Sequence, residues 1–198
     1  MPRMWGFMKQ NALWFGFAAG ALVMAIAGYF AFARPAFRGA VIDPPMLAPD
    51  FSIVDARGIQ FHMSDMRGKI VLLYFGYTHC PDECPLTMAH LKQALETLGS
   101  RAQGVQVVMV STDPARDTPQ ALDDFLGRFN PDFLGITGSP GDLEKIYEDY
   151  HVVVLEGGET HSSFTYVIDP KGFLRLTFVP DSTPGDIAND LGTLLAEN

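Results

Sequence analysis

Two closely spaced cysteines are the residues of this sequence most suited to chemistry. Cys80 and Cys84 are the only cysteines in the chain, and each is followed by a proline. Two thiols cannot build a four-thiolate iron–sulfur or zinc cage within one chain. Residues at i and i+4 can, however, lie on one side of a helical turn, where two sulfurs can close a disulfide or bind one soft metal ion. The spacing therefore predicts a redox-active pair or a small metal site.

The position of the pair favours reactive thiols. The cysteines follow a long apolar run, residues 69–78, and precede a predicted helix that contains residues 88–98. In open α/β sheets, sites form beyond the carboxyl ends of strands, and a helix N-terminus stabilises an anion there. A cysteine in this position becomes more acidic, and therefore a better nucleophile and metal ligand. A static disulfide is the alternative, but closing so short a loop stabilises a fold only slightly.

Two thiolates seldom complete a metal site, so the five histidines are candidates for a third ligand. His79 adjoins Cys80, and adjacency usually directs a side chain away from its neighbour. His62 and His90 are predicted to lie at the surface, and His151 begins a strand-like segment. His161 follows a glycine-rich loop and precedes a strong strand, and flexible loops of this kind can bring a ligand to a site. His161 is therefore the strongest candidate.

The elements that must position these residues alternate between strand-like and helix-like segments. Three helices are predicted to open with a hydroxyl cap followed by proline, at Thr118-Pro119, Ser139-Pro140 and Thr183-Pro184. The predicted strands are 51–54, 59–62, 69–78, 105–111, 164–170 and 173–178. The order is three strands, a helix, a strand, two helices, two strands and a final helix. This pattern predicts an α/β sandwich of the thioredoxin kind with an N-terminal hairpin.

The N-terminal part of the chain is predicted to be a membrane anchor. After a short segment, residues 1–12, residues 13–33 run without a charge for about 30 Å of helix. A cleaved signal peptide is the alternative, although its apolar region is usually shorter. Residues 34–49 contain four prolines and are predicted to be an extended tether, so the folded domain is expected at 50–198. We expect this domain in the periplasm or, alternatively, on the intermembrane-space side of the mitochondrial inner membrane, where a disulfide can persist.

The charge of the chain excludes one class of partner. The net charge is −9, yet the first 40 residues hold four basic residues and no acid. The remaining 158 residues hold 10 Lys and Arg against 23 Asp and Glu, a net charge of −13. Such a domain is not expected to bind a nucleic-acid backbone. A cationic protein or a metal ion suits this field better, although acidity can also serve solubility alone.

Three motifs carry a resemblance to a known family. They are YFGYTHCPDECP at 74–85, STDPARDTP at 111–119, and His161-Ser162 ahead of YVIDPKG at 166–172. In this order they resemble the Sco/SenC family over residues 47–196. That family consists of membrane-anchored, thioredoxin-like copper proteins that assist assembly of the copper centre of cytochrome c oxidase. The resemblance implies that Cys80, Cys84 and His161 bind copper, with Cys80 and Cys84 as a redox disulfide. It also implies a copper-receiving oxidase subunit, or another copper chaperone, as partner.

The chemistry of this ligand set agrees with copper. Two thiolates with one imidazole suit Cu(I), and they can also hold Cu(II). Because the ligands must lose protons, acid or oxidation to a disulfide is expected to release the metal. Zinc accepts the same residues, but the chain has no H-E-x-x-H or similar hydrolytic motif.

Thiol chemistry without copper gives the other functional candidates. A thiol–disulfide oxidoreductase acting on an extracytoplasmic partner is the main alternative function, although such enzymes commonly use C-x-x-C. A peroxidase is disfavoured, because the residues expected around its reactive cysteine are missing. The sequence neither supports nor excludes a copper or redox sensor.

Overall fold

The computed structural model describes residues 20–24, 37–155 and 161–197. The chain divides into two compact units, Met1–Ala36 and Phe37–Asn198. Residues 20–24 are helical. Within the described ranges, no helix combines the length and the apolar character that crossing a membrane requires. The predicted segments 1–12 and 13–33 lie outside the described residues, except for 20–24, and both stay predictions.

The second unit is built on a six-stranded mixed sheet, with the strand order β1-β8-β7-β4-β5-β6. Strands β4, β5 and β6 lie side by side and run parallel to one another. The pairs β4–β7, β7–β8 and β8–β1 are antiparallel. The strands are β1 (Ala40–Leu47), β4 (Ile70–Gly76), β5 (Val105–Ser111), β6 (Leu134–Ile136), β7 (Thr165–Ile168) and β8 (Phe173–Phe178). The parallel strands bring their carboxyl ends to one edge of the sheet, which is where the cysteines follow β4.

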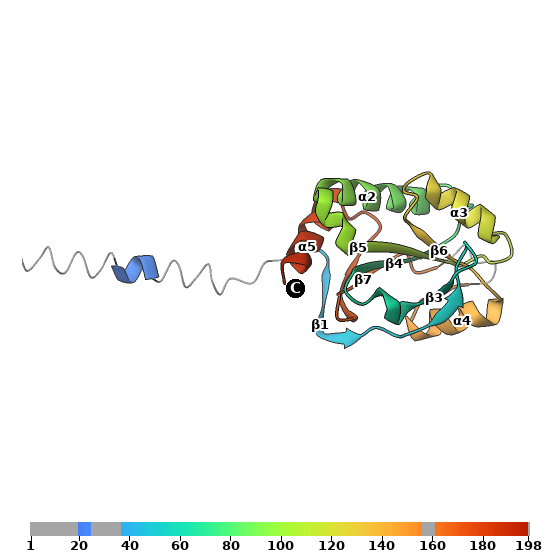
Figure 1. The fold of residues 1–198 in the computed structure, drawn as a ribbon, viewed down its shortest axis with the longest axis horizontal. Helices are drawn as coiled ribbons and strands as arrows, with labels where there is room; N and C mark the ends of the chain where they lie inside the picture. Colours follow the sequence, from blue (N-terminus) through green and yellow to red (C-terminus); the bar gives the residue numbers. More distant parts are fainter. Residues whose placement is uncertain (1–19, 25–36, 156–160, 198) are drawn as a thin grey trace, which may run out of the picture. The chain divides into compact units, whose positions relative to one another are not determined.

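Helices and a small hairpin cover the two faces of this sheet (Figure 1). The helices are α2 (Glu83–Leu98), α3 (Pro119–Gly127), α4 (Pro140–Asp149) and α5 (Pro184–Ala196), and the hairpin pairs β2 (Ser52–Val54) with β3 (Gln60–His62). Two short 3₁₀ helices, η1 (Met63–Met66) and η2 (Gly99–Gly104), complete the described elements.

The alternation of side chains along β4 creates two apolar layers. Ile70, Leu72 and Tyr74 enter the layer shared with α2, α3 and α5. Val71 and Phe75 enter the opposite layer, which is shared with α4 and the β2–β3 hairpin. All seven residues of β4 are buried. The continuous apolar run is thus explained by a strand covered on both faces, and the predicted thioredoxin-like α/β sandwich with its hairpin is confirmed.

The predicted tether is wrong over most of its length. Residues 40–47 form the edge strand β1, which pairs antiparallel with β8. Prolines are tolerated there because an edge strand needs only one side of its backbone for pairing. Pro44 and Pro45 fall in the register shift between Val41 and Met46. Residues 37–49 therefore belong to the folded domain, and the domain begins before the predicted boundary at Asp50.

A buried carboxylate joins the start of this domain to its last helix. Asp190 of α5 is fully buried, and it accepts hydrogen bonds from the backbone N–H groups of Arg38 and Gly39 at 2.8–3.0 Å. The Asn189 side chain donates a further bond at 3.0 Å. The residues just before β1 are therefore held against α5.

The predicted helix starts are confirmed by their caps. The hydroxyls of Thr118, Ser139 and Thr183 accept hydrogen bonds from the backbone three residues later, and proline follows each of them. Two other features differ from the prediction. The short strand β6 was not predicted, and His151 does not begin a strand, since its φ of 54° lies in the left-handed region.

Candidate metal centre

The two cysteines lie where β4 passes into α2. Strand β4 ends at Gly76, and α2 begins at Glu83 with Asp82 as its N-cap. Cys80 therefore belongs to the connecting loop, whereas Cys84 lies in the first turn of the helix. Both are free thiols, and the Cys84 backbone N–H donates to the Cys80 sulfur at 3.4 Å. The structure thus brings both sulfurs to the start of one helix.

The Cys84 sulfur is enclosed by the last residues of β4. The Tyr74 hydroxyl donates to it at 3.4 Å, and both side chains are fully buried. A Cβ atom at Gly76 would lie 3.0 Å from the sulfur and 2.6 Å from the Tyr74 ring. Glycine is therefore needed at position 76 to let the strand pass this close. Burial raises the pKa of Cys84 to about 12, despite the opposing hydrogen bond from Tyr74.

Cys80 has the opposite character. It is only partly buried. Partial burial alone raises the pKa of its thiol, but hydrogen bonds from the backbone N–H groups of Cys84 and Asp82 outweigh burial and lower this pKa below its ordinary value. Cys80 is therefore an accessible sulfur that is readily deprotonated, next to a buried sulfur that is not.

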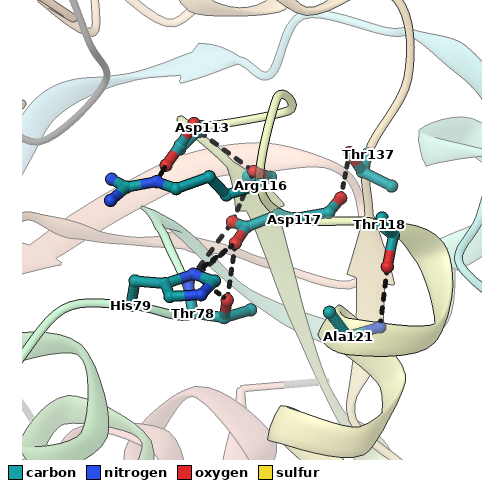
Figure 2. Close-up of polar contacts among 9 residues, drawn as sticks. Thr78, His79, Asp113, Arg116, Asp117, Thr118, Ala121 and Thr137 are labelled. Atoms are coloured by element: carbon teal, nitrogen blue, oxygen red, sulfur yellow. Dashed lines mark hydrogen bonds and ion pairs between the residues drawn. The ribbon is translucent and has the colours of Figure 1, made fainter.

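A buried carboxylate secures the loop ahead of Cys80, as Figure 2 shows. Asp117 accepts hydrogen bonds from the Thr78 backbone N–H at 3.1 and 3.2 Å, and from the Thr78 hydroxyl at 2.6 Å. The Ser111 hydroxyl donates to the same carboxylate at 2.7 Å. His79 is half exposed, and its Nδ1 lies 3.8 Å from Asp117. The His79 ring is directed toward this network.

His161 lies on a separate segment near the cysteine loop. It forms an isolated bridge with Val154, and its ring meets the Tyr77 ring edge-on at 5.8 Å between centroids. Two residues later, the Ser163 hydroxyl donates to Glu83, the first residue of α2, at 2.9 Å. These contacts bring the segment of His161 to the same end of the sheet as the cysteines.

The His161 ring presents one nitrogen that is suited to a metal. Nδ1 lies 3.2 Å from the Ser162 carbonyl oxygen. A carbonyl only accepts hydrogen bonds, so Nδ1 is the donor and Nε2 keeps its lone pair. Among the described residues, however, no three His, Cys, Asp or Glu side chains lie close enough together to bind one metal ion. The structure brings Cys80 and Cys84 together, and it places His161 nearby without closing a three-ligand site.

The remaining three histidines lie in other parts of the fold. His90 is bonded through Nδ1 to the Ser182 carbonyl oxygen at 3.1 Å. His62 ends β3 in the hairpin, and His151 is exposed at the turn after α4. Sequence reasoning did not single out Tyr74 or Asp117. Asp117 stands in the STDPARDTP motif, which was the only signal that could have drawn attention to it.

The donor set fits a soft metal ion. Two sulfurs and one imidazole nitrogen are the ligand types that Cu(I) prefers, and no carboxylate is needed. The lowered pKa of Cys80 favours its thiolate form, which is the form that binds metal.

Comparison with known proteins identifies the family of the chain. Residues 40–196 match the family model described as SCO1/SenC. Protein SenC of Rhodobacter capsulatus is 35% identical over 153 residues, which cover 73% of this chain and 69% of SenC. The solution structure of apo Sco1 from Thermus thermophilus has 34% identity and a TM-score of 0.73, and covers 82% of this chain and 99% of its own. ScoI from Bradyrhizobium japonicum with copper bound has 31% identity and a TM-score of 0.65, over 74% and 98% of the two chains.

The family match begins at the residue where β1 begins, and so includes the strand that the tether prediction had assigned to a linker. It extends over both cysteines, His161 and the Asp117 network, and ends within the last helix. The chain therefore belongs to the SCO1/SenC family.

Proposed function

We propose that this protein binds one copper ion through Cys80, Cys84 and His161 and delivers it during assembly of the copper centre of cytochrome c oxidase. The observation that carries this proposal is the pair of free, unlike thiols at the start of α2. Membership of the SCO1/SenC family supports it, and so does the copper-bound state of the Bradyrhizobium relative.

Copper loading follows from the difference between the two thiols. Cys80 is the accessible thiolate, so it takes the ion first from the donor that carries it. Cys84 then loses its proton as its sulfur binds, because the metal's positive charge offsets the desolvation that raises its pKa. Binding of Cu(I) to both sulfurs thus releases a proton from every cysteine that was still a thiol before the metal bound. The Nε2 atom of His161 supplies the third ligand.

The receiving partner is a copper-binding subunit of the oxidase, or a further copper chaperone. Transfer requires each protein ligand to be replaced in turn by a ligand of the acceptor. The partly buried Cys80 and the segment of His161 are accessible to such exchange, whereas the buried Cys84 is not. We infer that Cys84 is the last ligand to release the ion. The negative charge of the domain favours an acceptor with a basic docking face.

A second function is favoured by the same difference between the thiols. The Cys80 thiolate can attack a disulfide of the partner and form a mixed disulfide, which releases one partner thiolate. Cys84 then attacks the Cys80 sulfur, which releases the second partner thiolate and leaves a Cys80–Cys84 disulfide. The partner gains two electrons and this chain loses two. Such a reaction prepares the cysteines of a copper site for loading.

The location proposed for the protein is a membrane surface outside the cytoplasm. We infer that residues 13–33 anchor the chain and that the domain faces the periplasm, or the intermembrane space if the chain is mitochondrial. A reporter enzyme fused after Asn198 tests this inference. Activity confined to the extracytoplasmic side supports it, and activity in the cytoplasm overturns it.

The copper proposal is tested by metal stoichiometry on the reduced full chain in detergent. The protein is loaded with Cu(I) in the presence of a competing chelator and compared with the Cys80→Ala/Cys84→Ala double variant. About one copper ion per chain, lost in the variant, supports the proposal. No tightly held copper, together with rapid disulfide exchange with a partner thiol, favours the thiol–disulfide function instead.

A further inference from the structure

Asp117 is a buried acidic residue to which the copper chemistry assigns no part. Its side chain is fully buried, and its carboxylate accepts hydrogen bonds from the Thr78 backbone, the Thr78 hydroxyl and the Ser111 hydroxyl. The half-exposed His79 ring lies nearby, with its Nδ1 at 3.8 Å from the carboxylate. The carboxylate is thus stabilised mainly by neutral donors, an arrangement that depends on their exact placement.

The network spans the ends of three parallel strands. Thr78 follows β4, Ser111 ends β5, and Thr137 follows β6 and donates its hydroxyl to the Asp117 main-chain oxygen at 3.0 Å. The Thr112 backbone N–H also donates to the Gly76 carbonyl at 2.8 Å. Figure 2 shows Asp117 between Thr78 and Thr137. One residue therefore ties the loop that leads to Cys80 to the edge of the sheet.

Residues 113–117, which include Asp117, also contact Tyr77, the residue whose ring packs against His161. Arg116 is paired with Asp113, and its guanidinium carbon lies 5.9 Å from the centre of the Tyr77 ring. The Tyr77 ring also contacts the His161 ring, at 5.8 Å between ring centroids. Residues 113–117 thus contact both residues that precede the His79-Cys80 dipeptide, Tyr77 through Arg116 and Thr78 through Asp117.

We propose that Asp117 is a positioning residue for Cys80: it clamps Thr78 and so holds the Cys80 sulfur in the open, dithiol geometry that accepts a metal ion. Cys84 needs no such clamp, because α2 and Tyr74 already hold its sulfur. Disulfide formation requires the Cys80 sulfur to move onto Cys84. Release of the Thr78 clamp makes that movement easier, and it leaves the dithiol less suited to copper.

The proposal is tested first on the metal-free thiols, so its outcome does not depend on the proposed copper function. The reduced full chain is equilibrated with mixtures of oxidised and reduced dithiothreitol. Formation of the Cys80–Cys84 disulfide transfers two electrons and two protons to the oxidised reagent, which becomes the dithiol. We expect Asp117→Asn to shift this equilibrium about tenfold toward the disulfide, which corresponds to a potential lower by about 30 mV.

Two variants at position 78 refine the test. Thr78→Val removes the hydroxyl donor and keeps the backbone N–H, so it is expected to shift the equilibrium in the same direction by a smaller factor. Thr78→Ser restores the hydroxyl and is expected to behave as the wild type. Where copper binding is established, Asp117→Asn is further expected to lower Cu(I) affinity about 10- to 100-fold, as is usual when a residue that supports a ligand is lost.

A matched control separates positioning from a general loss of stability. Thr183→Ala removes the cap of α5, a hydroxyl that accepts from the Asp186 backbone N–H at 3.2 Å and makes no bond to Thr78 or Asp117 among the described hydrogen bonds. A shift in Asp117→Asn and Thr78→Val, absent in Thr183→Ala and reversed in Thr78→Ser, supports the proposal. An unchanged thiol equilibrium in Thr78→Val, or an equal shift in Thr183→Ala, overturns it. If Asp117→Asn does not fold, the position 78 variants decide the question.

Discussion

The turn that carries the two cysteines and the segment that carries His161 are held in place by different kinds of contact. Around the cysteines the bonds are buried or partly buried: Asp117 accepts from Thr78, and Tyr74 donates to Cys84. Around His161 the contacts are an isolated bridge, one ring contact, a bond from Nδ1 to the neighbouring Ser162 carbonyl and an exposed hydrogen bond from Ser163. Buried hydrogen bonds are costly to break, whereas exposed ones exchange readily with water.

This difference suggests how a transfer protein can bind a metal firmly and still release it. The thiols are preset by the fold, and the imidazole is held by contacts that can rearrange. We therefore expect the thiols to dominate affinity and His161 to determine the coordination geometry and the ease of exchange. The predictions below test this division, starting with the largest expected effect.

The strongest test removes the thiols one at a time. In Cys80→Ala and in Cys84→Ala, copper bound under chelator competition is expected to fall from about one equivalent to background, because one thiolate and one imidazole make a weak site for Cu(I). Metal analysis after gel filtration measures this loss. Retention of tight copper in either variant would show that the ligands lie elsewhere.

Removal of the imidazole is expected to have a smaller effect on Cu(I). His161→Ala leaves both thiolates, which can hold Cu(I) as a two-coordinate pair. We expect Cu(I) affinity to fall by at least about tenfold, or 1.4 kcal/mol, and the Cu(II) absorption bands to be lost. His90→Ala is a suitable control, because that ring is bonded to the Ser182 carbonyl oxygen. Equal Cu(II) spectra for His161→Ala and the wild type would contradict the division.

The pH dependence of alkylation distinguishes the two thiols. The pKa of Cys80 is lowered, so a larger fraction is thiolate at neutral pH, and the midpoint of its reaction with iodoacetamide is expected below the ordinary pKa of a thiol. The pKa of Cys84 is raised to about 12, so its reaction is still rising at pH 9. Mass spectrometry of Cys84→Ser and Cys80→Ser measures each profile alone. Coinciding profiles would remove the basis for assigning the thiols different roles.

Loss of the buried hydroxyl beside Cys84 is expected to be milder. Tyr74→Phe keeps the ring in the core and removes the hydrogen bond to the Cys84 sulfur. The free energy of unfolding is expected to fall by about 1 kcal/mol, the usual contribution of such a bond. Denaturant titration measures this change. A more stable variant would mean that the desolvation cost of burying the hydroxyl exceeds the stabilisation from its hydrogen bond to the sulfur.

The smallest effect is expected where the His161 segment meets α2. Ser163→Ala removes its exposed bond to Glu83, and stability is expected to change by less than about 0.5 kcal/mol. Thr193→Ala removes a comparable exposed bond within α5 and serves as the control. Copper exchange with a chelator is expected to be faster in Ser163→Ala alone. A large stability loss in that variant would show that the segment is held more firmly than its contacts indicate.

The sequence was sufficient where local rules decide the structure. The caps at Thr118, Ser139 and Thr183 and the apolar run of β4 specify their elements directly, and the spacing of the cysteines placed them at a helix start. The edge strand β1 was missed because prolines usually exclude a strand, and only pairing with β8 accommodates them. The three-residue strand β6 is too short to show a periodic pattern.

The sequence pointed to the proposed ligands of the candidate site, and it did not point to the residues that support them. Cys80 and Cys84 are distinctive by type and spacing, and a family resemblance pointed to His161. Nothing local shows that Asp117 is buried, because an aspartate in a loop is usually solvated. Likewise, Tyr74 is one of several aromatic residues in an apolar run, and its bond to Cys84 depends on the register between β4 and α2.

The bond between Asp190 and the backbone of Arg38 and Gly39 has a consequence for proteolytic processing. These partners lie 152 and 151 residues apart in the sequence. A peptidase that trimmed the domain past Gly39 would remove those amides and leave the buried carboxylate with the Asn189 side chain alone. Leaving a buried carboxylate without these donors lowers the free energy of unfolding by more than about 1–3 kcal/mol. Removal of residues at the N-terminal border of the domain would therefore destabilise its C-terminal helix. The stability of the folded domain thus depends on the presence of the residues just before β1.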